Sequence, residues 1–236
     1  MEQESGVIKS TGNGVAEYDP NVLGAGSEVD VGDVKLSYLG VLNAASDLVK
    51  EDKNKQGEIV DRETGEVFGY KDKGVDIVVL KSYKYWMHKD ANDNYTGRTP
   101  AKTRDDFPWT GPNGEENIYT HAFLVLIKNQ MDEQVELPYR ITLSSSGLKT
   151  AQKLSKFLMT MARKGEASWN KSFHLSAKLF KNDKNTWWGF DISPSEDTSD
   201  DIRKNAYSWY NTVGDPNEVT KTEETITEPL QEDGQF

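Results

Sequence analysis

The sequence predicts a mostly β fold with one amphipathic helix, and three observations support this prediction. Short runs rich in β-branched and aromatic residues recur along the middle of the chain, separated by turns rich in Gly, Asn and Asp. Residues 146–164 instead repeat their apolar side chains every three or four positions, as a helix does. The 236 residues include no cysteine, which excludes a disulfide framework and a thiolate metal site.

The predicted elements begin at residue 57. In order, they are a hairpin at Gly57–Gly69, a strand at Val75–Trp86, a second hairpin at residues 118–129 and 137–144, the helix at 146–164, strands at 168–181 and 186–192, and a short helix at 202–213. Residues 87–117 are rich in Asp, Asn, Gly and Pro, so they predict a long connection between strands.

The charge of the chain is unevenly distributed. The net charge of −11 by itself disfavours binding to nucleic acid. However, residues 1–33 and 214–236 each hold seven acidic residues and one lysine, whereas Leu137–Phe190 holds ten basic residues against two acidic ones. We therefore predict a flexible N-terminal arm at 1–33, a core at 34–213 and a disordered acidic tail at 214–236.

Aromatic and basic residues alternate after residue 80. Single-stranded nucleic acid exposes base faces and phosphates together, so a groove that binds it needs rings beside cations. The residues predicted to form such a groove are Lys81, Tyr83, Lys84, Tyr85, Trp86 and Arg98. The alternative is an ordinary sheet, in which the aromatic face is core and the lysine face is only solvated.

The polar face of the predicted helix is basic and carries the candidate phosphate-binding residues Lys149, Lys153 and Lys156. A run of lysines is usually a solvated face. Here no acidic residue lies between Leu137 and Gly165, so the usual compensation by i,i+4 ion pairs is missing. We expect this face to bind phosphates or an acidic partner, and the acidic tail of the same chain is an alternative partner.

Catalytic and metal-binding motifs are not found. Asp90–Gly97 opens like a calcium loop, but Tyr95 stands where glycine is needed and Ala101 where glutamate is needed. The three histidines have no ligand spacing, and no phosphate-binding or nucleophile motif occurs. The sequence therefore predicts no enzymatic activity, no metal and no cofactor.

The sequence also predicts a protein without a signal peptide or a membrane span. The first residues lack a basic stretch followed by an apolar one. The longest apolar run, Ala122–Ile127, is far shorter than the roughly 20 residues that a spanning helix needs.

The last residues, EPLQEDGQF, resemble the acidic tails of bacterial and phage single-stranded DNA-binding proteins. In those proteins the terminal carboxylate and apolar side chain dock on partner proteins, and a backbone nest or an arginine can capture such a carboxylate. The resemblance implies that Asp233 and Phe236 bind a replication or recombination protein. The alternative is an ordinary frayed acidic end.

The order of segments in the core is also similar to that of a family. GEIVDRETGEVFG, VDIVVLKSYKYW, ITLSSSGLKTAQKLSKFL, FHLSAKLF and WWGFDI, within residues 34–192, resemble a family of tailed-phage proteins regarded as single-stranded DNA-binding. The resemblance implies an OB-like barrel of five strands with a helix between two of them. It also implies a protein that coats single strands during phage DNA replication, recombination or repair in the cytoplasm of the infected bacterium. The alternative is a virion component or a DNA-mimicking inhibitor that binds no nucleic acid.

Overall fold

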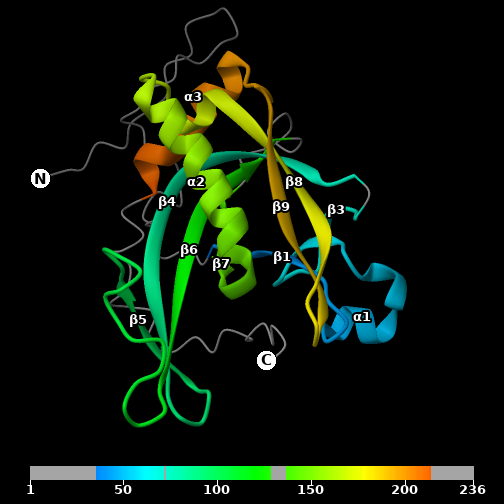
Figure 1. The fold of residues 1–236 in the computed structure, drawn as a ribbon. Helices are drawn as coiled ribbons and strands as arrows, with labels where there is room; N and C mark the ends of the chain where they lie inside the picture. Colours follow the sequence, from blue (N-terminus) through cyan, green and yellow to red (C-terminus); the bar gives the residue numbers. More distant parts are fainter. Residues whose placement is uncertain (1–35, 72, 129–136, 214–236) are drawn as a thin grey trace, which may run out of the picture.

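The computed structural model describes residues 36–71, 73–128 and 137–213, and antiparallel strands dominate it (Figure 1). A small sheet has the order β1-β2-β3, from β1 (Leu39–Val41), β2 (Ile59–Asp61) and β3 (Val67–Gly69). A larger sheet has the order β7-β6-β4-β8-β9, with β5 beside β4. Its strands are β4 (Val75–Lys89), β5 (Tyr95–Pro100), β6 (Glu116–Ile127), β7 (Tyr139–Ser144), β8 (Lys171–Lys181) and β9 (Thr186–Asp197).

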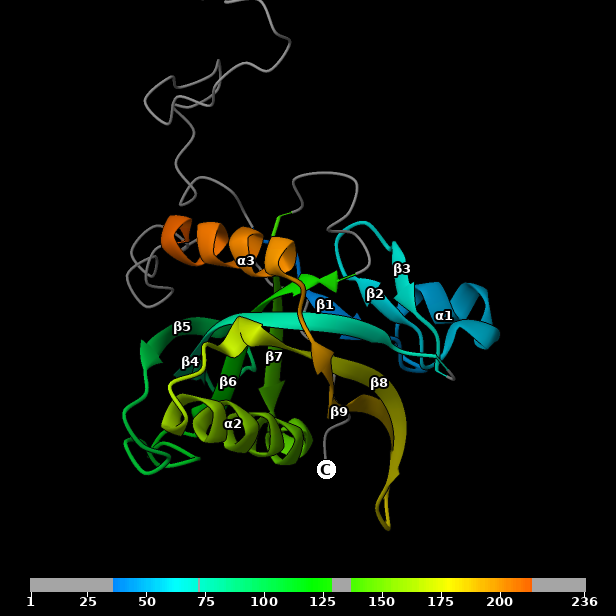
Figure 2. The ribbon, with the colours of Figure 1, turned by 90° about the horizontal axis from the view of Figure 1, so that it is seen from above.

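In the described residues, three helices accompany the sheets: α1 (Asp47–Glu51), α2 (Leu148–Arg163) and α3 (Asp200–Thr212). Short 3-10 turns lie at Lys53–Lys55, Ser145–Gly147 and Ser168–Asn170. The large sheet lies between α2 on one face and α3 on the other, as the view from above shows (Figure 2). The small sheet and α1 lie at one side of this arrangement (Figure 1).

The long strand β4 organises the large sheet. It pairs with β6 along most of its 15 residues, and its other edge pairs with β8 at its start and with β5 at its end. The register with β6 shifts between Val79 and Lys81, which is a bulge at Leu80. Val75, Ile77 and Val79 pack in the cluster that includes residues of α2, whereas Val78, Leu80, Tyr83 and Tyr85 pack in the cluster that includes residues of α3. Odd-numbered residues of β4 therefore face the α2 side of the sheet before the bulge and the α3 side after it.

The ends of both long helices have clear local causes. Gly165, at a φ of 74°, lies just beyond α2, and the N–H groups of Gly165 and Glu166 bond the carbonyls of Ala162 and Met161. This is the arrangement by which glycine in the left-handed region ends helices. At the start of α3, the Ser199 hydroxyl accepts the N–H of Ile202.

The prediction of a mostly β protein with one basic amphipathic helix is confirmed, and so are the predicted segments around β4, β6, β7, α2, β8, β9 and α3. The five-stranded OB-like barrel is not confirmed. Within the described residues neither sheet closes on itself, and both keep open edges. In the same residues, every helix is too short or too polar to cross a lipid bilayer.

Candidate nucleic-acid interface

The three aromatic residues predicted to stack on bases lie in the core. Tyr83 and Tyr85 are 7% and 5% exposed, and their rings stack at 6.0 Å in the cluster that α3 covers. Trp86 is 0% exposed. A base needs an open ring face on which to stack. The rings of Tyr83, Tyr85 and Trp86 are therefore not open to a base in this structure, and their role in DNA binding stays a prediction.

Trp86 is buried because the long connection after β4 folds back over it. Its indole meets the rings of Phe107, Trp109 and Tyr119 at centroid distances of 5.9, 5.5 and 5.2 Å. Leu148, the first residue of α2, belongs to the same cluster. The indole nitrogen is buried without a hydrogen-bond partner in the described part of the chain. Trp86 is thus a packing centre between the loop and the sheet.

Two of the predicted cations near these rings, Lys81 and Arg98, lie on the α3 side of β4, whereas Lys84 lies on the opposite side. The ammonium of Lys81 donates to the carbonyl of Val213 at the end of α3, and it lies 4.8 Å from the Tyr210 ring centroid. A cation at a helix C-terminus stabilises the helix dipole, so the structure gives Lys81 a capping role. Arg98 lies over the Tyr85 ring at 5.5 Å, and Lys84 is exposed on β4.

The other predicted cations, Lys149, Lys153 and Lys156, are exposed along α2. The apolar face of the same helix, which includes Ala151, Leu154 and Met161, is buried against the sheet. The three lysines can therefore meet a ligand without any change in the core.

A surface that combines exposed cations with partly exposed rings lies on the hairpin of β8 and β9. Phe180 and Trp187 pair across the two strands, and their rings stack at 6.0 Å with an interplanar angle of 16°. The Lys178 ammonium lies 5.9 Å from the Phe180 ring centroid. Paired residues and residues two apart share one face of a sheet. Ser176, Lys178, Phe180, Trp187, Gly189 and Asp191 therefore form one face, called the hairpin face below.

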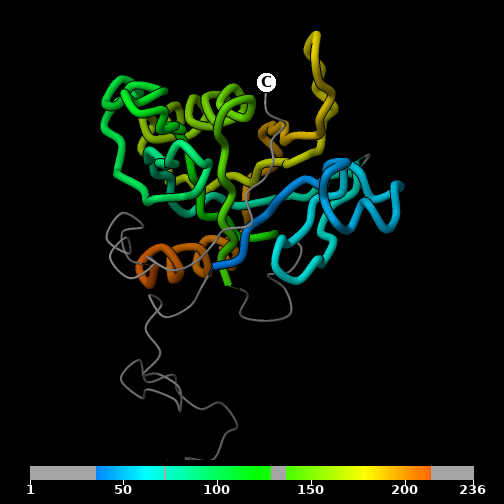
Figure 3. The backbone as a smooth tube through the Cα atoms, turned by 90° about the horizontal axis from the view of Figure 1, so that it is seen from below, coloured from blue at the N-terminus to red at the C-terminus, as the bar shows by residue number. Residues whose placement is uncertain are grey.

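Gly189 leaves room for the Phe180 ring on this face. A Cβ at position 189 would come within 3.2 Å of the Phe180 ring, which is tighter than an ordinary contact. The hairpin projects from the rest of the molecule (Figure 3), and Lys181 and Lys184 are exposed near its turn. The sequence alternation in residues 171–181, followed by the two tryptophans at 187 and 188, was the signal that could have identified this face.

Asp191 connects the hairpin face to α2. One of its carboxylate oxygens lies 2.9 Å from the Lys153 ammonium. The neighbouring hydrogen bond from Thr150 to the carbonyl of Phe190, at 2.7 Å, also joins the helix to β9. Lys153 of α2 therefore borders the hairpin face at Asp191.

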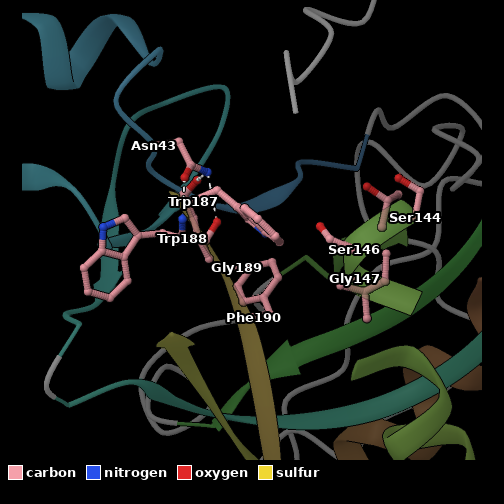
Figure 4. Close-up of a pocket in the computed structure, with 11 residues that line it drawn as sticks. Asn43, Ser144, Ser146, Gly147, Trp187, Trp188, Gly189 and Phe190 are labelled. Atoms are coloured by element: carbon pink, nitrogen blue, oxygen red, sulfur yellow. Dashed lines mark hydrogen bonds between the residues drawn. The ribbon is translucent and has the colours of Figure 1, made fainter. Parts of the chain in front are cut away.

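A pocket of about 50 Å³, called the hairpin pocket below, lies beside the part of β9 that follows the hairpin turn. Trp187, Trp188, Gly189 and Phe190 stand on one side of it, and Ser144, Ser146 and Gly147 on the other (Figure 4). Its other lining residues are Val41, Asn43, Thr142 and Leu143, so no charged side chain borders it. It offers hydroxyl and amide groups beside aromatic rings.

A larger hollow of about 400 Å³ lies at the far end of the sheet, between His88, Phe107, Pro108 and Asn117. Polar groups on both sides of it already have partners within the protein. Asp90 accepts the N–H groups of Asn92 and Asn94, and both nitrogens of His88 are bonded, to Asn117 and Thr99. Because these groups hold the loops together, we do not regard this hollow as the binding site.

The predicted partner-binding residues Asp233 and Phe236 lie outside the described residues, as do the predicted arm at 1–33 and tail at 214–236. In the part of the chain that is described, no three His, Asp or Glu side chains are grouped as metal ligands would be.

Fold and surface together define a class: a mostly antiparallel protein with its large sheet between two helices and a projecting hairpin that carries rings and lysines. A family model for Pam3 phage gp34-like proteins matches residues 11–218, so the chain belongs to that family. The prediction of a phage protein is thereby confirmed. No curated protein and no solved structure matches the chain.

Proposed function

We propose that the protein binds single-stranded DNA with little sequence preference during replication, recombination or repair of phage DNA in the host cytoplasm. The observation that carries this proposal is the hairpin face. It places Phe180 and Trp187 beside Lys178, and Asp191 continues it to Lys153 on α2. A single strand can stack its bases on such rings while its phosphates contact the neighbouring cations.

The lysines and the aromatic rings would contribute to binding in different ways. The lysines neutralise phosphates, so log affinity should fall with log salt by about 0.7 per phosphate neutralised. The rings stack on bases and contribute roughly 1–3 kcal/mol per base without reading the sequence. Duplex DNA hides its base faces, so only the lysine contribution remains available to it.

The test is a binding titration with a labelled oligo(dT) and a duplex of equal length, over a series of salt concentrations. We expect clear preference for the single strand, and Trp187→Ala should weaken binding by roughly 1–3 kcal/mol. Tyr207→Ala is the matched control, because Tyr207 is a 58% exposed ring on α3, away from the hairpin face. Equal affinity for both DNA forms, or equal losses in both variants, would contradict the proposal.

A second candidate is a virion or interaction protein that binds no nucleic acid. The observation that favours it is a ring cluster on α3, where Tyr207 and Tyr210 are 58% and 39% exposed. Their ring centroids lie 6.3 and 5.0 Å from that of Trp169. Exposed aromatic clusters are typical of protein interfaces. Passage through single-stranded DNA cellulose without retention at every salt concentration would favour this candidate.

A further inference from the structure

Asp191 is an acidic residue in the middle of the proposed DNA-binding surface. Its carboxylate bonds the Lys153 ammonium at 2.9 Å and accepts the N–H of Ile192 at the same distance. The side chains of Asp191 and Lys153 are 34% and 43% exposed, so the pair is open to solvent. The carboxylate therefore lies beside a lysine that the proposed function assigns to DNA phosphates.

The charges around Asp191 keep it ionised. Burial raises the pKa of its carboxyl group, but the hydrogen bonds from Lys153 and Ile192 and the positive charges of Lys153 and Lys178 outweigh this effect. The net result is a pKa below the ordinary value, so the carboxylate is negative at neutral pH. Lysines of both α2 and β8 therefore act on it.

We propose that Asp191 is an internal competitor of DNA phosphates, which pairs with Lys153 in the free protein and gives up this lysine when a strand binds. The inference rests on the proposed function and names a residue that regulates the affinity of the same surface. Oxygen anions of similar size compete for the ammonium, and the carboxylate, which stays on the protein, also repels the incoming phosphate.

The Asp191–Lys153 pair is not needed to hold α2 against β9. The anchoring of α2 to β9 is already provided by the Thr150 hydroxyl, which donates to the Phe190 carbonyl at 2.7 Å in a buried position. An exposed ion pair adds little stability to such an anchor. Loss of the Asp191 charge should therefore change DNA affinity more than it changes the melting temperature.

The test is Asp191→Asn, which keeps the shape and an acceptor for the Ile192 N–H but removes the charge. Asp197→Asn is the matched control, because Asp197 is also on β9 and pairs with Lys171 at 2.8 Å, beyond the hairpin face. We expect Asp191→Asn to tighten binding of oligo(dT) at low salt about two- to five-fold, the range expected for one exposed ion pair. Asp197→Asn should tighten it less.

A second comparison isolates Lys153. Lys153→Gln should weaken binding more in the Asp191→Asn protein than in the natural one, because only there is the lysine released from its internal partner. Unchanged or weaker binding by Asp191→Asn, or equal effects of both Asp variants, would overturn the inference while leaving the proposed function intact. Absence of binding by every form, natural protein included, would overturn the proposed function and this inference with it.

Discussion

The side-chain amide of Asn43 bonds both backbone groups of Trp188. Its oxygen accepts the Trp188 N–H at 2.6 Å, and its nitrogen donates to the Trp188 carbonyl at 3.0 Å. Asn43 follows β1 by two residues, so one side chain joins the small sheet to the outer edge of β9 as a neighbouring strand would. The hairpin is fixed at this point, close to its turn and directly beside the hairpin pocket.

Replacing this amide should destabilise the protein. Asn43→Ala leaves both Trp188 groups without their partner, and we expect a loss of about 1–2 kcal/mol in the free energy of unfolding. Denaturant titration measures this loss. Asn54→Ala, at an exposed asparagine in the 3-10 turn after α1, is the control and should change the free energy by less than about 0.5 kcal/mol. Equal effects would show that the Asn43 side chain contributes no stability.

Trp86 should behave as a core residue in mutation experiments. Trp86→Ala removes a side chain with 0% exposure, so we expect a loss of about 3–5 kcal/mol in the free energy of unfolding. Trp86→Phe should cost less, because it keeps part of the ring packing and removes the buried N–H without a partner. Affinity of the folded Trp86→Phe protein for single-stranded DNA should match that of the natural protein. A stable variant with weakened DNA binding would support the stacking role predicted from the sequence.

The sequence predicted the elements of this fold better than their packing. Periodicity was sufficient for α2, whose apolar residues follow the helical repeat and whose end is marked by Gly165. Turn signals and β-prone runs were sufficient for β4, β6, β8 and β9. These features are local, so one chain segment contains all the information needed to recognise them.

The location of the rings was not predictable in the same way. The bulge at Leu80 reverses the side on which later residues lie, and it places Tyr83 and Tyr85 under α3. Trp86 faces the other way, where Phe107 and Trp109 of a distant loop cover it. Both events depend on packing between segments far apart in the chain, and simple alternation from Val75 cannot reveal them. The burial of these three rings follows from this non-local packing.

The lysines of α2 should contribute to DNA binding without contributing to stability. Lys149, Lys153 and Lys156 changed together to Gln should weaken binding of oligo(dT) and reduce the salt slope by about 0.7 for each phosphate that is no longer neutralised. The melting temperature should hardly change, because all three side chains are exposed. The control removes the same charge elsewhere, by changing the exposed Lys73, Lys102 and Lys204 to Gln. Equal weakening in both triple variants would indicate an effect of net charge alone.

His121 should make the protein sensitive to mild acid. Burial lowers the pKa of this imidazole from 6.5 to about 4, and the positive charge of Lys84 acts in the same direction. Between pH 6.5 and about pH 4, His121 is therefore neutral in the folded state but protonated in the unfolded chain. Stability is unaffected by this residue above pH 6.5 and falls as the pH drops from there towards 4.

This shift corresponds to a loss of about 2 kcal/mol between pH 7 and pH 5. Denaturant titrations at the two pH values measure it, and His121→Phe should show a smaller difference between them. Any constant cost of replacing the ring cancels in that comparison. A pH dependence identical in both proteins would show that His121 is protonated in the folded state as easily as in the unfolded chain.

The acidic C-terminal segment supplies the last prediction. Residues 214–236 hold seven acidic residues and one lysine, and they follow directly on Val213, whose carbonyl is bonded by Lys81. A polyanion tethered to the protein competes with DNA for the lysines of α2 and the hairpin at a high effective concentration. Removal of residues 214–236 should therefore tighten binding of oligo(dT) at low salt, and the gain should shrink as salt screens the charges. A full-length variant with the seven acidic residues changed to Asn or Gln should reproduce the gain, because the charge and not the length of the segment is responsible.

Removal of Phe236 alone leaves the side-chain charges unchanged, so DNA binding should be preserved while docking of a replication or recombination protein is lost. Identical affinities of the full-length and shortened proteins at low salt would contradict the competition, and pull-downs that recover the same partners with and without Phe236 would contradict the docking role.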